Sequence, residues 1–555
     1  MGRKLTFRVP RHTSKPPRPL IVSDRAATLS LLFSIQKQTD AYTPELVNPA
    51  VYRVLQKFDR PPTSLLYIPR NLQPSPFEYY CTVNEGDSSF QTEPRLSVTK
   101  LLTGSWCELQ LFYDVYAGSR KKQQTTRLTE GSEYHDKLEK EEHALADLTG
   151  AEAELAEVAA KHSEEDTLYL GRNLSSAIWC KANTEHVIKR GINLAHTRHA
   201  REIAVHAYVN LETGNLATEE DQFEDSVLVN GIADIVQFEP KNKEAAEGNS
   251  DISADNLLQE FSGLSLSSQV WDLSRLIPEA EEELQRDYQK YNIQVRDVKT
   301  RGTKSLPKSK SQLNAARLQC MYYTRFLRNL MRNQDFAYAS YQENARRRQV
   351  DPDSHIGEAH ATVLLLQNFE ALALDYVRLA KGEDIGYETH DSIMREMYSS
   401  EEEAIRLNYN LSRFISEEQF RSFLRIVYGD DLASDEVDIS PLFNSWRYPL
   451  TARFFSARST QILYTLRQYE SSTVCVDYHH AKSSTLISSL EYPYHVKEVN
   501  AALKDAAMFW SGKRQPRGTD SEFKCQNCDY RSRCPVLNKQ SQQSIGALIY
   551  HDLLS

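Results

Sequence analysis

The sequence predicts an α/β fold, in which a strand-rich core begins near residue 200 and carries helical elaborations. Three observations lead to this prediction. Apolar runs typical of strands flank Asn230-Gly231 and return at residues 292–300. Helical patterns follow at about 313–333 and over most of 355–470. Near the C-terminus, a C-x2-C-x5-C-P run indicates metal or redox chemistry rather than disulfides.

Composition narrows the class of protein. At 555 residues the chain can bury at least one large core. The formal net charge of −10 excludes a uniformly basic nucleic-acid binder, but a local basic groove stays open because charge can segregate between faces. Eight cysteines are too few for a secreted disulfide scaffold. No apolar run reaches the ~18 residues of a membrane-spanning helix, so no such helix is expected.

The N-terminus is basic and has no acid before Asp24. Its cations are Arg3, Lys4, Arg8, Arg11, Lys15 and Arg18. Basic, acid-free leaders are typical of mitochondrial transit peptides, so residues 1–25 are predicted to be a disordered or removed targeting leader. Four prolines at positions 10–19 weaken the amphipathic-helix part of this interpretation. The alternative is a disordered basic tail that touches nucleic acid.

The segments before the strand-rich core have mixed character. Residues 26–95 combine short apolar segments with prolines and predict a loop-rich N-terminal segment. A Ser/Thr start predicts a helix from Leu96 to about Tyr116. The highly charged, Ala/Glu-rich stretch at 119–166 predicts a solvated helical insertion, with a lid over the substrate as the alternative.

The core is predicted to contain a hairpin and a second insertion. Asn230-Gly231 between two apolar runs is a strong hairpin turn signal. Residues 240–290 are acidic and Ser-rich, which predicts a long, partly disordered insertion between two core strands. The strand at 292–300 follows, then the helix from about Leu313 to Asn333. A last helix, from Glu498, leads into the cysteine run.

Three charged residues suggest metal-assisted phosphodiester cleavage. Asp297 and Lys299 are two apart on a predicted strand and therefore share a face. The carboxylate can ligate Mg²⁺, and the ammonium can orient the attacking water and offset phosphate charge. Asp234, on a preceding predicted strand, could complete a site for one or two metal ions. The alternatives are a surface ion pair and an acid with ordinary hydrogen bonds in a hairpin.

Residues on either side of these acids could complete the site. Upstream, His196 or His199 could add an imidazole ligand, and the sequence does not decide between them. Downstream, Gln319 and Tyr323 share a helix face at i and i+4 and could orient the lysine or contact a nucleic-acid strand. A histidine at the surface or in the core is the alternative for either imidazole.

Arginines interleaved with aromatic residues continue along the same predicted helix and beyond it. Such a pattern suits a channel for single strands, because it combines phosphate contact with base stacking. The alternative is a solvated helix face with the aromatic rings in the core. The candidate nucleic-acid-binding residues are Arg325, Arg328, Arg332 and Tyr338.

The cysteine run itself is compatible with either of two kinds of metal centre. Cys525, Cys528 and Cys534 could hold zinc or an iron–sulfur cluster. The second C-x2-C or H-x3-H pair of common zinc sites is missing, so a fourth ligand would have to be distant in sequence.

The order His, Asp234, Asp297-x-Lys299 and Gln319-x-x-x-Tyr323 resembles the RecB-type branch of the PD-(D/E)xK nucleases, over roughly residues 95–335 and the cysteine tail. This resemblance implies a restriction-endonuclease-type core, a mixed sheet flanked by helices, within a nuclease domain at 96–550. In iron–sulfur relatives a fourth cysteine precedes the nuclease motifs, and Cys107 fits that place. The resemblance therefore implies a [4Fe–4S] cluster on Cys107 and the three C-terminal cysteines, stapling the N- and C-terminal parts, with zinc as the alternative.

Both constellations, on a chain without a P-loop motif, make it similar to the exonuclease V family and to its fungal mitochondrial members. The family implies a Mg²⁺-dependent exonuclease on single-stranded DNA, with Mn²⁺ as an alternative metal, that serves genome maintenance in the mitochondrial matrix. Asp234, Asp297 and the Val298 carbonyl would bind the metal. The histidine departs from the pattern, because the spacing from Gly191 to His196 is one residue longer than usual and His199 competes.

The expected partner is single-stranded DNA, a single-strand-binding protein is a further candidate, and a monomer is expected. Two other functions stay open. One is a catalytically inactive iron–sulfur or zinc scaffold that binds nucleic acid. The other is an accessory factor whose helical region at 355–470 recruits partners. The sequence does not fix the polarity of digestion, the product length or the preference for DNA over RNA.

Overall fold

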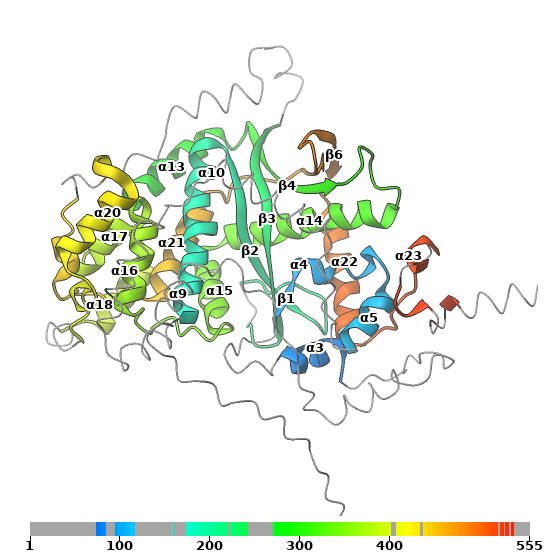
Figure 1. The fold of residues 1–555 in the computed structure, drawn as a ribbon, viewed down its shortest axis with the longest axis horizontal. Helices are drawn as coiled ribbons and strands as arrows, with labels where there is room; N and C mark the ends of the chain where they lie inside the picture. The colour runs from blue at the N-terminus through cyan, green and yellow to red at the C-terminus, as the bar shows by residue number, and fades with distance from the viewer. Residues whose placement is uncertain are drawn as a thin grey trace, which may run out of the picture.

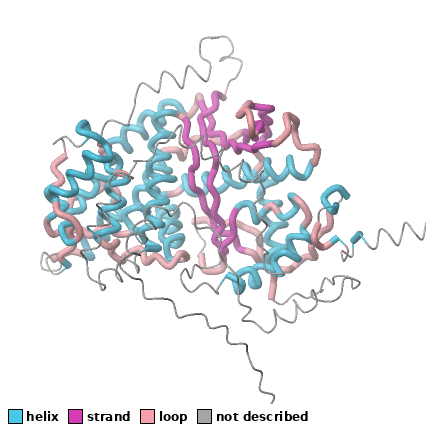
Figure 2. Tube along the Cα trace, in the orientation of Figure 1, coloured by secondary structure: helices cyan, strands magenta, loops and turns pink. Residues whose placement is uncertain are grey.

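The computed structural model has one mixed β-sheet at its centre, with helices packed around it (Figures 1 and 2). The predicted leader, residues 26–73 and the predicted insertion at 119–166, apart from Val158, lie outside the described part of the chain. The described residues are 74–84, 95–116, 158, 174–219, 223–241, 270–400, 407–432, 437–519, 522–526, 528–531, 534 and 536–537.

Six strands form the sheet. They are β1 (Arg95–Ser97), β2 (His199–Asn210), β3 (Ser226–Pro240), β4 (Tyr291–Arg301), β5 (Thr473–His480) and β6 (Leu486–Pro493). Their order is β1-β3-β4-β5-β6, and β2 also pairs with β3. The pairs β1·β3 and β4·β5 are parallel and the other pairs are antiparallel. The expected mixed sheet is therefore confirmed, and its strand at 292–300 is β4.

The predicted hairpin turn at Asn230-Gly231 is wrong. β3 runs through both residues without a turn, and β2 pairs with it from Asn210↔Ser226 to His199↔Gln237. Gly231 serves packing instead, because a Cβ there would meet the ring of Tyr323 and lie 2.9 Å from Cγ2 of Val98. A glycine inside a strand often marks such a close approach.

Two long helical segments flank the long strands. One is continuous from α9 (Leu174–Asn183) through the π-helical turn η4 (Thr184–Lys189) to α10 (Arg190–Thr197), and it leads directly into β2. The other is α14 (Lys310–Arg332), which confirms the predicted helix and lies across the strands in Figure 1.

Most other helices gather beside β2, on the left of Figure 1. They are α13 (Leu273–Asp287), α15 (Gln334–Arg346), α16 (Glu358–Gln367), α17 (Phe369–Lys381), α18 (Glu388–Met397), η6 (Leu411–Arg413), α20 (Glu417–Leu432), η7 (Ser440–Phe443) and α21 (Ala452–Tyr464). α13 falls inside the predicted insertion at 240–290, yet it packs through Leu273, Ile277 and Leu284. Inside this group Arg458 and Asp375 form a fully buried, two-pronged ion pair.

The two ends of the described chain meet on the other side of the sheet. The elements there are α3 (Pro76–Asn84), α4 (Val98–Leu101), η3 (Thr103–Ser105), α5 (Glu108–Tyr116), α22 (Val496–Trp510) and α23 (Glu522–Gln526). The single helix predicted from Leu96 to Tyr116 is therefore wrong, because the segment forms β1 and three short helices. Its carbonyls at Ser105 and Trp106 accept hydrogen bonds from Lys524, which a continuous helix would have used internally.

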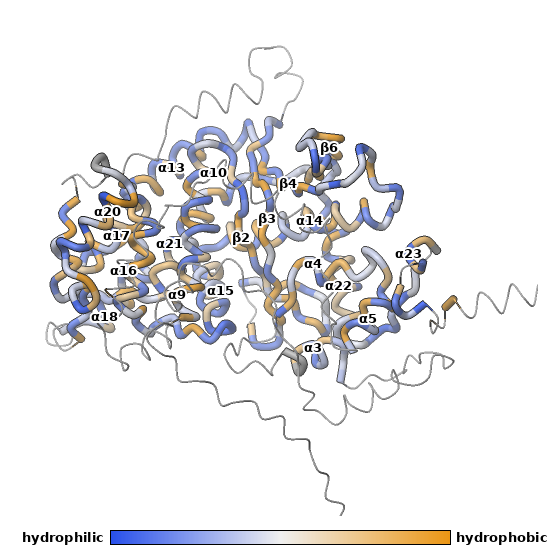
Figure 3. The backbone as a smooth tube through the Cα atoms, in the orientation of Figure 1, coloured by the Kyte–Doolittle hydropathy of each residue, from blue (hydrophilic) through white to orange (hydrophobic). Residues whose placement is uncertain are grey.

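Hydrophobic residues of the long strands lie inside this arrangement. Figure 3 shows them in the middle of the molecule, and Ile203, Val209, Val229 and Val236 have no exposed surface. Within the described residues, no helix is both long enough and apolar enough to span a bilayer.

Candidate active site

The candidate site lies where β3 and β4 separate. Their antiparallel pairing runs from Pro240↔Tyr291 to Ile235↔Arg296 and stops there. Beyond this point β3 pairs with β1, and β4 continues beside β5. Asp234 and Asp297 are the next residues of the two strands, so the two carboxylates meet at the fork. Oδ2 of Asp234 accepts a hydrogen bond of 2.8 Å from the backbone N–H of Val298, across the fork.

Asp297 and Lys299 form a buried ion pair at this fork. Asp297 is completely buried, and Nζ of Lys299 lies 2.9 Å from its Oδ1 and 2.7 Å from its Oδ2. The ammonium also donates to Oε1 of Gln319 at 3.2 Å, and Nε2 of Gln319 donates to the Tyr323 hydroxyl at 2.9 Å. The predicted face of α14 thus orients the lysine through its amide.

The electrostatics of the fork favour a cation. Burial raises the pKa of Asp297, and the Asp234 carboxylate raises it further, although Lys299 opposes both effects. Burial would lower the pKa of Lys299, but Asp297 and Asp234 outweigh it and raise that pKa. Two carboxylates, one of them fully buried, lie near a single ammonium, and a divalent cation would relieve the repulsion between them.

The donor set at the fork fits a hard cation. Oδ2 of Asp297 is buried, and apart from its 2.7 Å ionic contact with the Lys299 ammonium it accepts no hydrogen bond from a described residue. Carboxylate oxygens are the ligands that Mg²⁺ prefers, and Mg²⁺ usually keeps several waters. Among the described residues, no three histidine, cysteine, aspartate or glutamate side chains are grouped tightly enough to hold a metal ion by themselves. Water would therefore have to fill the remaining positions.

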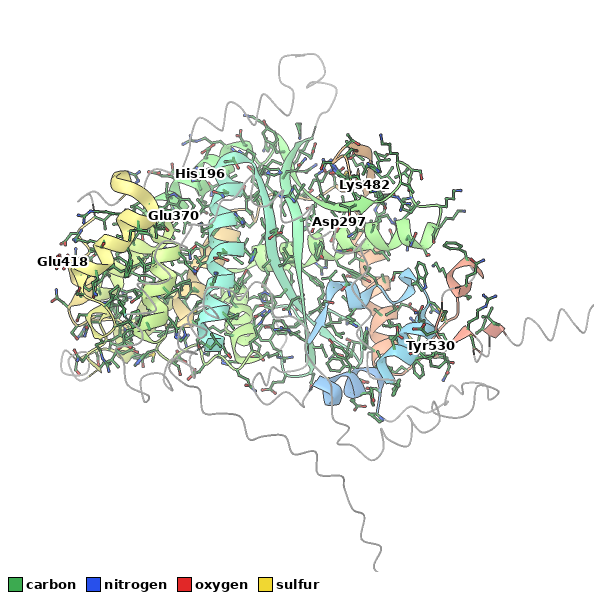
Figure 4. The ribbon with its side chains drawn as sticks, in the orientation of Figure 1. His196, Asp297, Glu370, Glu418, Lys482 and Tyr530 are labelled. Atoms are coloured by element: carbon green, nitrogen blue, oxygen red, sulfur yellow. The ribbon has the colours of Figure 1, made fainter. Side chains whose placement is uncertain are left out.

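Neither predicted histidine lies at the fork. His199 pairs with Gln237, three residues from Asp234 along β3, so it points to the opposite face of the sheet. Burial, with Arg201 and Arg296 nearby, lowers the pKa of His199 to about 4. His196 ends α10 beside Glu283 of α13, and Figure 4 shows it on the far side of β2 and β3 from Asp297.

A different histidine, His186, lies beside the residue of β2 that is opposite Asp234. It belongs to the π-helical turn η4, and its Nδ1 lies 3.1 Å from the backbone oxygen of Glu202. Glu202 occupies the β2 position opposite Asp234, between the pairs Arg201↔Ile235 and Ile203↔Ala233, and it has a φ of 52°. π-turns and left-handed non-glycine residues are frequent at functional sites. Sequence spacing carries no signal for His186, because only the packing of η4 on β2 brings it there.

The predicted nucleic-acid-binding residues are not brought together with this site. With 3.6 residues per turn, Arg325, Arg328 and Arg332 lie roughly half a turn around α14 from Gln319. The guanidinium of Arg328 stacks on Tyr494 at 5.9 Å. Tyr338 is 4% exposed and packs against Tyr387, so its ring is not presented to a base. The ring of Tyr338 and the guanidinium of Arg328 thus pack against other side chains, whereas Arg332 is exposed on the face of α14 away from the fork.

The four predicted cluster cysteines lie near enough to influence one another's charge. Burial raises the pKa of the Cys528 thiol, a hydrogen bond with the Tyr530 backbone opposes this shift, and Cys107, Cys525 and Cys534 add smaller upward effects. Burial is the largest cause that raises the pKa of Tyr113 in α5. Negative charge on Cys534, Cys107 and Cys528 raises this pKa further. All eight cysteines of the chain belong to the described residues, and none of them forms a disulfide. Thiols from both ends of the chain therefore lie in one region, although no three of them are grouped tightly enough in this structure to hold a metal ion.

Basic residues near these cysteines have protein partners. Arg514 makes a two-pronged ion pair with buried Glu108, and Arg517 pairs with Asp505. Lys513 pairs with Glu212. The pair of Arg514 with Glu108 joins the N- and C-terminal parts of the chain, and each of the three cations is balanced by a carboxylate.

A carboxylate pair at a sheet fork, with a lysine two residues on, is the arrangement that the RecB-type nuclease resemblance implies. Comparison with known proteins agrees. The family described as "Exonuclease V - a 5' deoxyribonuclease" matches residues 88–535. A protein named "Exonuclease V, mitochondrial" from Clavispora lusitaniae is 38% identical over 510 residues, which cover 92% of this chain and 98% of that protein.

Other yeast relatives carry the same name. The Candida albicans protein is 31% identical over 539 residues, covering 93% of this chain and 85% of its own length. The Eremothecium gossypii protein is 27% identical over 458 residues, covering 81% and 78%. The chain therefore belongs to the exonuclease V family of 5' deoxyribonucleases, which are hydrolases.

Proposed function

We propose that this chain is a Mg²⁺-dependent 5' exonuclease that degrades single-stranded DNA in mitochondria. The observation that carries the proposal is the fork, where Asp234, Asp297 and Lys299 meet beside Gln319. Family membership supplies the 5' deoxyribonuclease activity. Mg²⁺ dependence and single-strand preference rest on the donor set and on the resemblance. The mitochondrial location, with the matrix as the compartment, rests on the names of the relatives and on the basic leader.

Each residue at the fork has a distinct role in this proposal. Asp234, Asp297 and the Val298 carbonyl hold the metal, which when bound stabilises the charge that develops on the phosphate oxygens. The N–H of Val298 donates to Asp234, which holds this stretch of backbone beside the carboxylates. Lys299 orients the attacking water and offsets phosphate charge. Gln319 and Tyr323 fix the lysine, because their hydrogen bonds hold its ammonium beside Asp297.

His186 takes the place foreseen for His196 or His199. The contact of Nδ1 with the Glu202 carbonyl orients the ring and leaves Nε2 to face a ligand or a water. Side chains of both residues are about a quarter exposed, at 25% and 27%, so a substrate can reach them.

We further propose that Cys107, Cys525, Cys528 and Cys534 hold a [4Fe–4S] cluster, in preference to zinc. Thiolates from both ends of the nuclease domain at 96–550 would share one centre, which closes a very long loop. The entropic gain rises only slowly with loop length. Hydrogen bonds such as Arg514 to Glu108 already join the same ends, so the cluster reinforces an existing contact.

Alanine substitutions at the fork test the nuclease proposal. Asp297→Ala and Lys299→Ala should each reduce Mg²⁺-dependent release of nucleotides from 5'-labelled single-stranded DNA by about 10³-fold or more, since each removes a charge at the reacting phosphate. Thermal unfolding should show both proteins folded. The matched control is Arg286→Ala, whose side chain on α13 is 75% exposed. Near-normal turnover of either fork variant would overturn the assignment and favour the non-catalytic scaffold.

Metal analysis of anaerobically purified protein tests the cluster. The expected result is a brown protein with about four irons and four sulfides per chain. Cys107→Ser should lower the iron content, whereas Cys180→Ser, a buried cysteine of α9, should leave it unchanged. A colourless protein that binds zinc in equal amounts would contradict the iron–sulfur proposal and leave the fork untouched.

A further inference from the structure

The end of β4 extends the candidate site into a strongly cationic surface. Arg301 follows Lys299 by two residues, so it lies on the same face of β4, about 7 Å farther along. It pairs with His480 at the end of β5, and the N–H of Ala481 donates to the Arg301 carbonyl at 2.8 Å. The loop after β4 and the turn between β5 and β6 therefore form one rim beside the fork.

This rim, called here the basic edge, has cations without balancing acids. Its members are Arg301, Lys304, Lys308, Lys310 and Lys482. The sequence has no acid between Asp297 and Asp335, and none between Asp477 and Glu491. None of the five makes an ion pair with any residue that the structure describes. Lys304, Lys308, Lys310 and Lys482 are exposed, and Figure 4 shows Lys482 on the Asp297 side of the sheet.

The positive charge of the basic edge contrasts with the negative net charge of the chain. The formal net charge is −10, and several cations elsewhere are matched by acids, as Arg514 is by Glu108 and Arg517 by Asp505. An unbalanced cluster next to a site concentrates anions there. The chemistry that it fits is a phosphate backbone.

Exposed aromatic rings continue the surface from the basic edge. Lys524 contacts Ser311, the second residue of α14 and the neighbour of Lys310, and its ammonium lies 5.5 Å from the ring of Trp106. Trp106 is 38% exposed and Phe523, beside Lys524, is 70% exposed. Aromatic rings next to cations are how single strands are held without sequence preference.

We propose that the basic edge and the aromatic pair Trp106/Phe523 form one track, which holds the single-stranded DNA leading to Asp234 and Asp297. The phosphates lie along the basic edge, and bases stack on the two rings. This inference rests on the proposed function and adds the place where the strand is held. That place is away from Arg325, Arg328 and Arg332, which lie on the opposite face of α14.

Salt-dependent binding tests the cationic half. The edge variant is Lys304→Ala, Lys308→Ala and Lys482→Ala together, measured with a fluorescent oligo-dT in EDTA. Losing three phosphate contacts should flatten the slope of log K against log salt by about 2 and weaken binding up to about 100-fold at 0.1 M salt. The matched control removes three exposed cations on and after α13, Arg275, Arg286 and Lys290. An edge variant with the slope and affinity of this control would overturn the proposal.

A second pair of variants tests the aromatic half. Trp106→Ala with Phe523→Ala should weaken binding about 10-fold or more at both low and high salt, with an unchanged slope, because stacking releases no counterions. Iron content is read alongside, since Phe523 is close to Cys525. The control is Met397→Ala with Ile426→Ala, two exposed apolar side chains of α18 and α20. Equal affinity of the two double variants would exclude the rings from the track.

A small substrate separates this inference from the proposed function. The edge variant should hydrolyse bis(p-nitrophenyl) phosphate with Mg²⁺ as fast as the unsubstituted chain, because that substrate is too short to reach the track. If the unsubstituted chain cleaves neither substrate, the proposed function fails while the binding result still stands. If the edge variant loses the small-substrate activity as well, the edge belongs to the catalytic site and the track is refuted.

Discussion

Lys299 shows how a single residue connects the sheet to the helix across the fork. Its ammonium contacts Asp297 on its own strand and Gln319 on α14, and Gln319 is in turn fixed by Tyr323. These residues could be predicted from sequence because spacings of i,i+2 on a strand and i,i+4 on a helix decide their shared faces. The position of His186 beside the fork could not be predicted from the sequence. It depends on how η4 packs against β2, which no local spacing encodes.

Substituting the three histidines separately will show which of them serves the fork. His186→Ala should lower the exonuclease rate about 10-fold or more and raise the Mg²⁺ concentration needed for half-maximal activity, since it removes an imidazole beside Glu202. His196→Ala and His199→Ala, away from the fork, should leave the Mg²⁺ dependence unchanged. The measurement is the rate as a function of Mg²⁺ for each protein. A change confined to His196 or His199 would refute the role given to His186.

At the scale of elements, long-range pairing overrides a local signal in β3. Asn230-Gly231 has the sequence of a tight turn, but the register with β2 continues through it and the glycine accommodates Tyr323 and Val98. Turn propensity is a local preference, whereas the pairing buries Val229 and Val236 on the long strands. The short helices around Cys107 have the same cause, because contacts with Lys524 and Arg514 shape that segment from far along the chain.

Gly231→Ala tests this account of β3. The added methyl group would overlap the Tyr323 ring, so we expect a loss of about 1–3 kcal/mol in unfolding free energy, as for overpacked cores. The exonuclease rate should fall too, because Tyr323 anchors Gln319. Denaturant unfolding and kinetics measure the two effects. Gly302→Ala, where the same methyl group meets nothing within 4 Å, is the matched control, and equal stability of both variants would contradict the packing role.

At the scale of the whole molecule, the sequence predicts the order of chemical groups better than the architecture. The helix α14, the strand β4 and the mostly helical region after residue 355 are foreseen from their periodicity. No strand is predicted at 473–493, yet β5 and β6 complete the sheet there. β6 is a largely exposed edge strand without a regular apolar face, and β5 ends in two histidines, so neither has a clear period-2 pattern. The 5' polarity of digestion is likewise known from membership of the family, and no residue in the sequence predicts it.

Buried neutral histidines should make the stability of the whole molecule sensitive to mild acid. Burial lowers the pKa of His206 to about 3 and the pKa of His360 to about 4, against 6.5 in an unfolded chain. Below pH 6.5 the unfolded chain binds protons that the folded chain refuses, so stability is complete above about pH 6.5 and is lost as the pH falls toward 4. By proton linkage, each of these histidines lowers the free energy of unfolding by on the order of 2–3 kcal/mol when the pH reaches 4.

His360→Leu isolates this effect. His360 is 2% exposed within α16 and its Nδ1 has no hydrogen-bond partner, so leucine can replace it without stranding a polar group. We expect the melting temperature of this variant to fall less steeply between pH 7.5 and 5 than that of the unsubstituted chain. His495→Leu, at an exposed position, should follow the unsubstituted chain. If both variants fall in parallel with it, buried histidines do not set the acid sensitivity, and protonation of paired carboxylates such as Asp477 would be its cause.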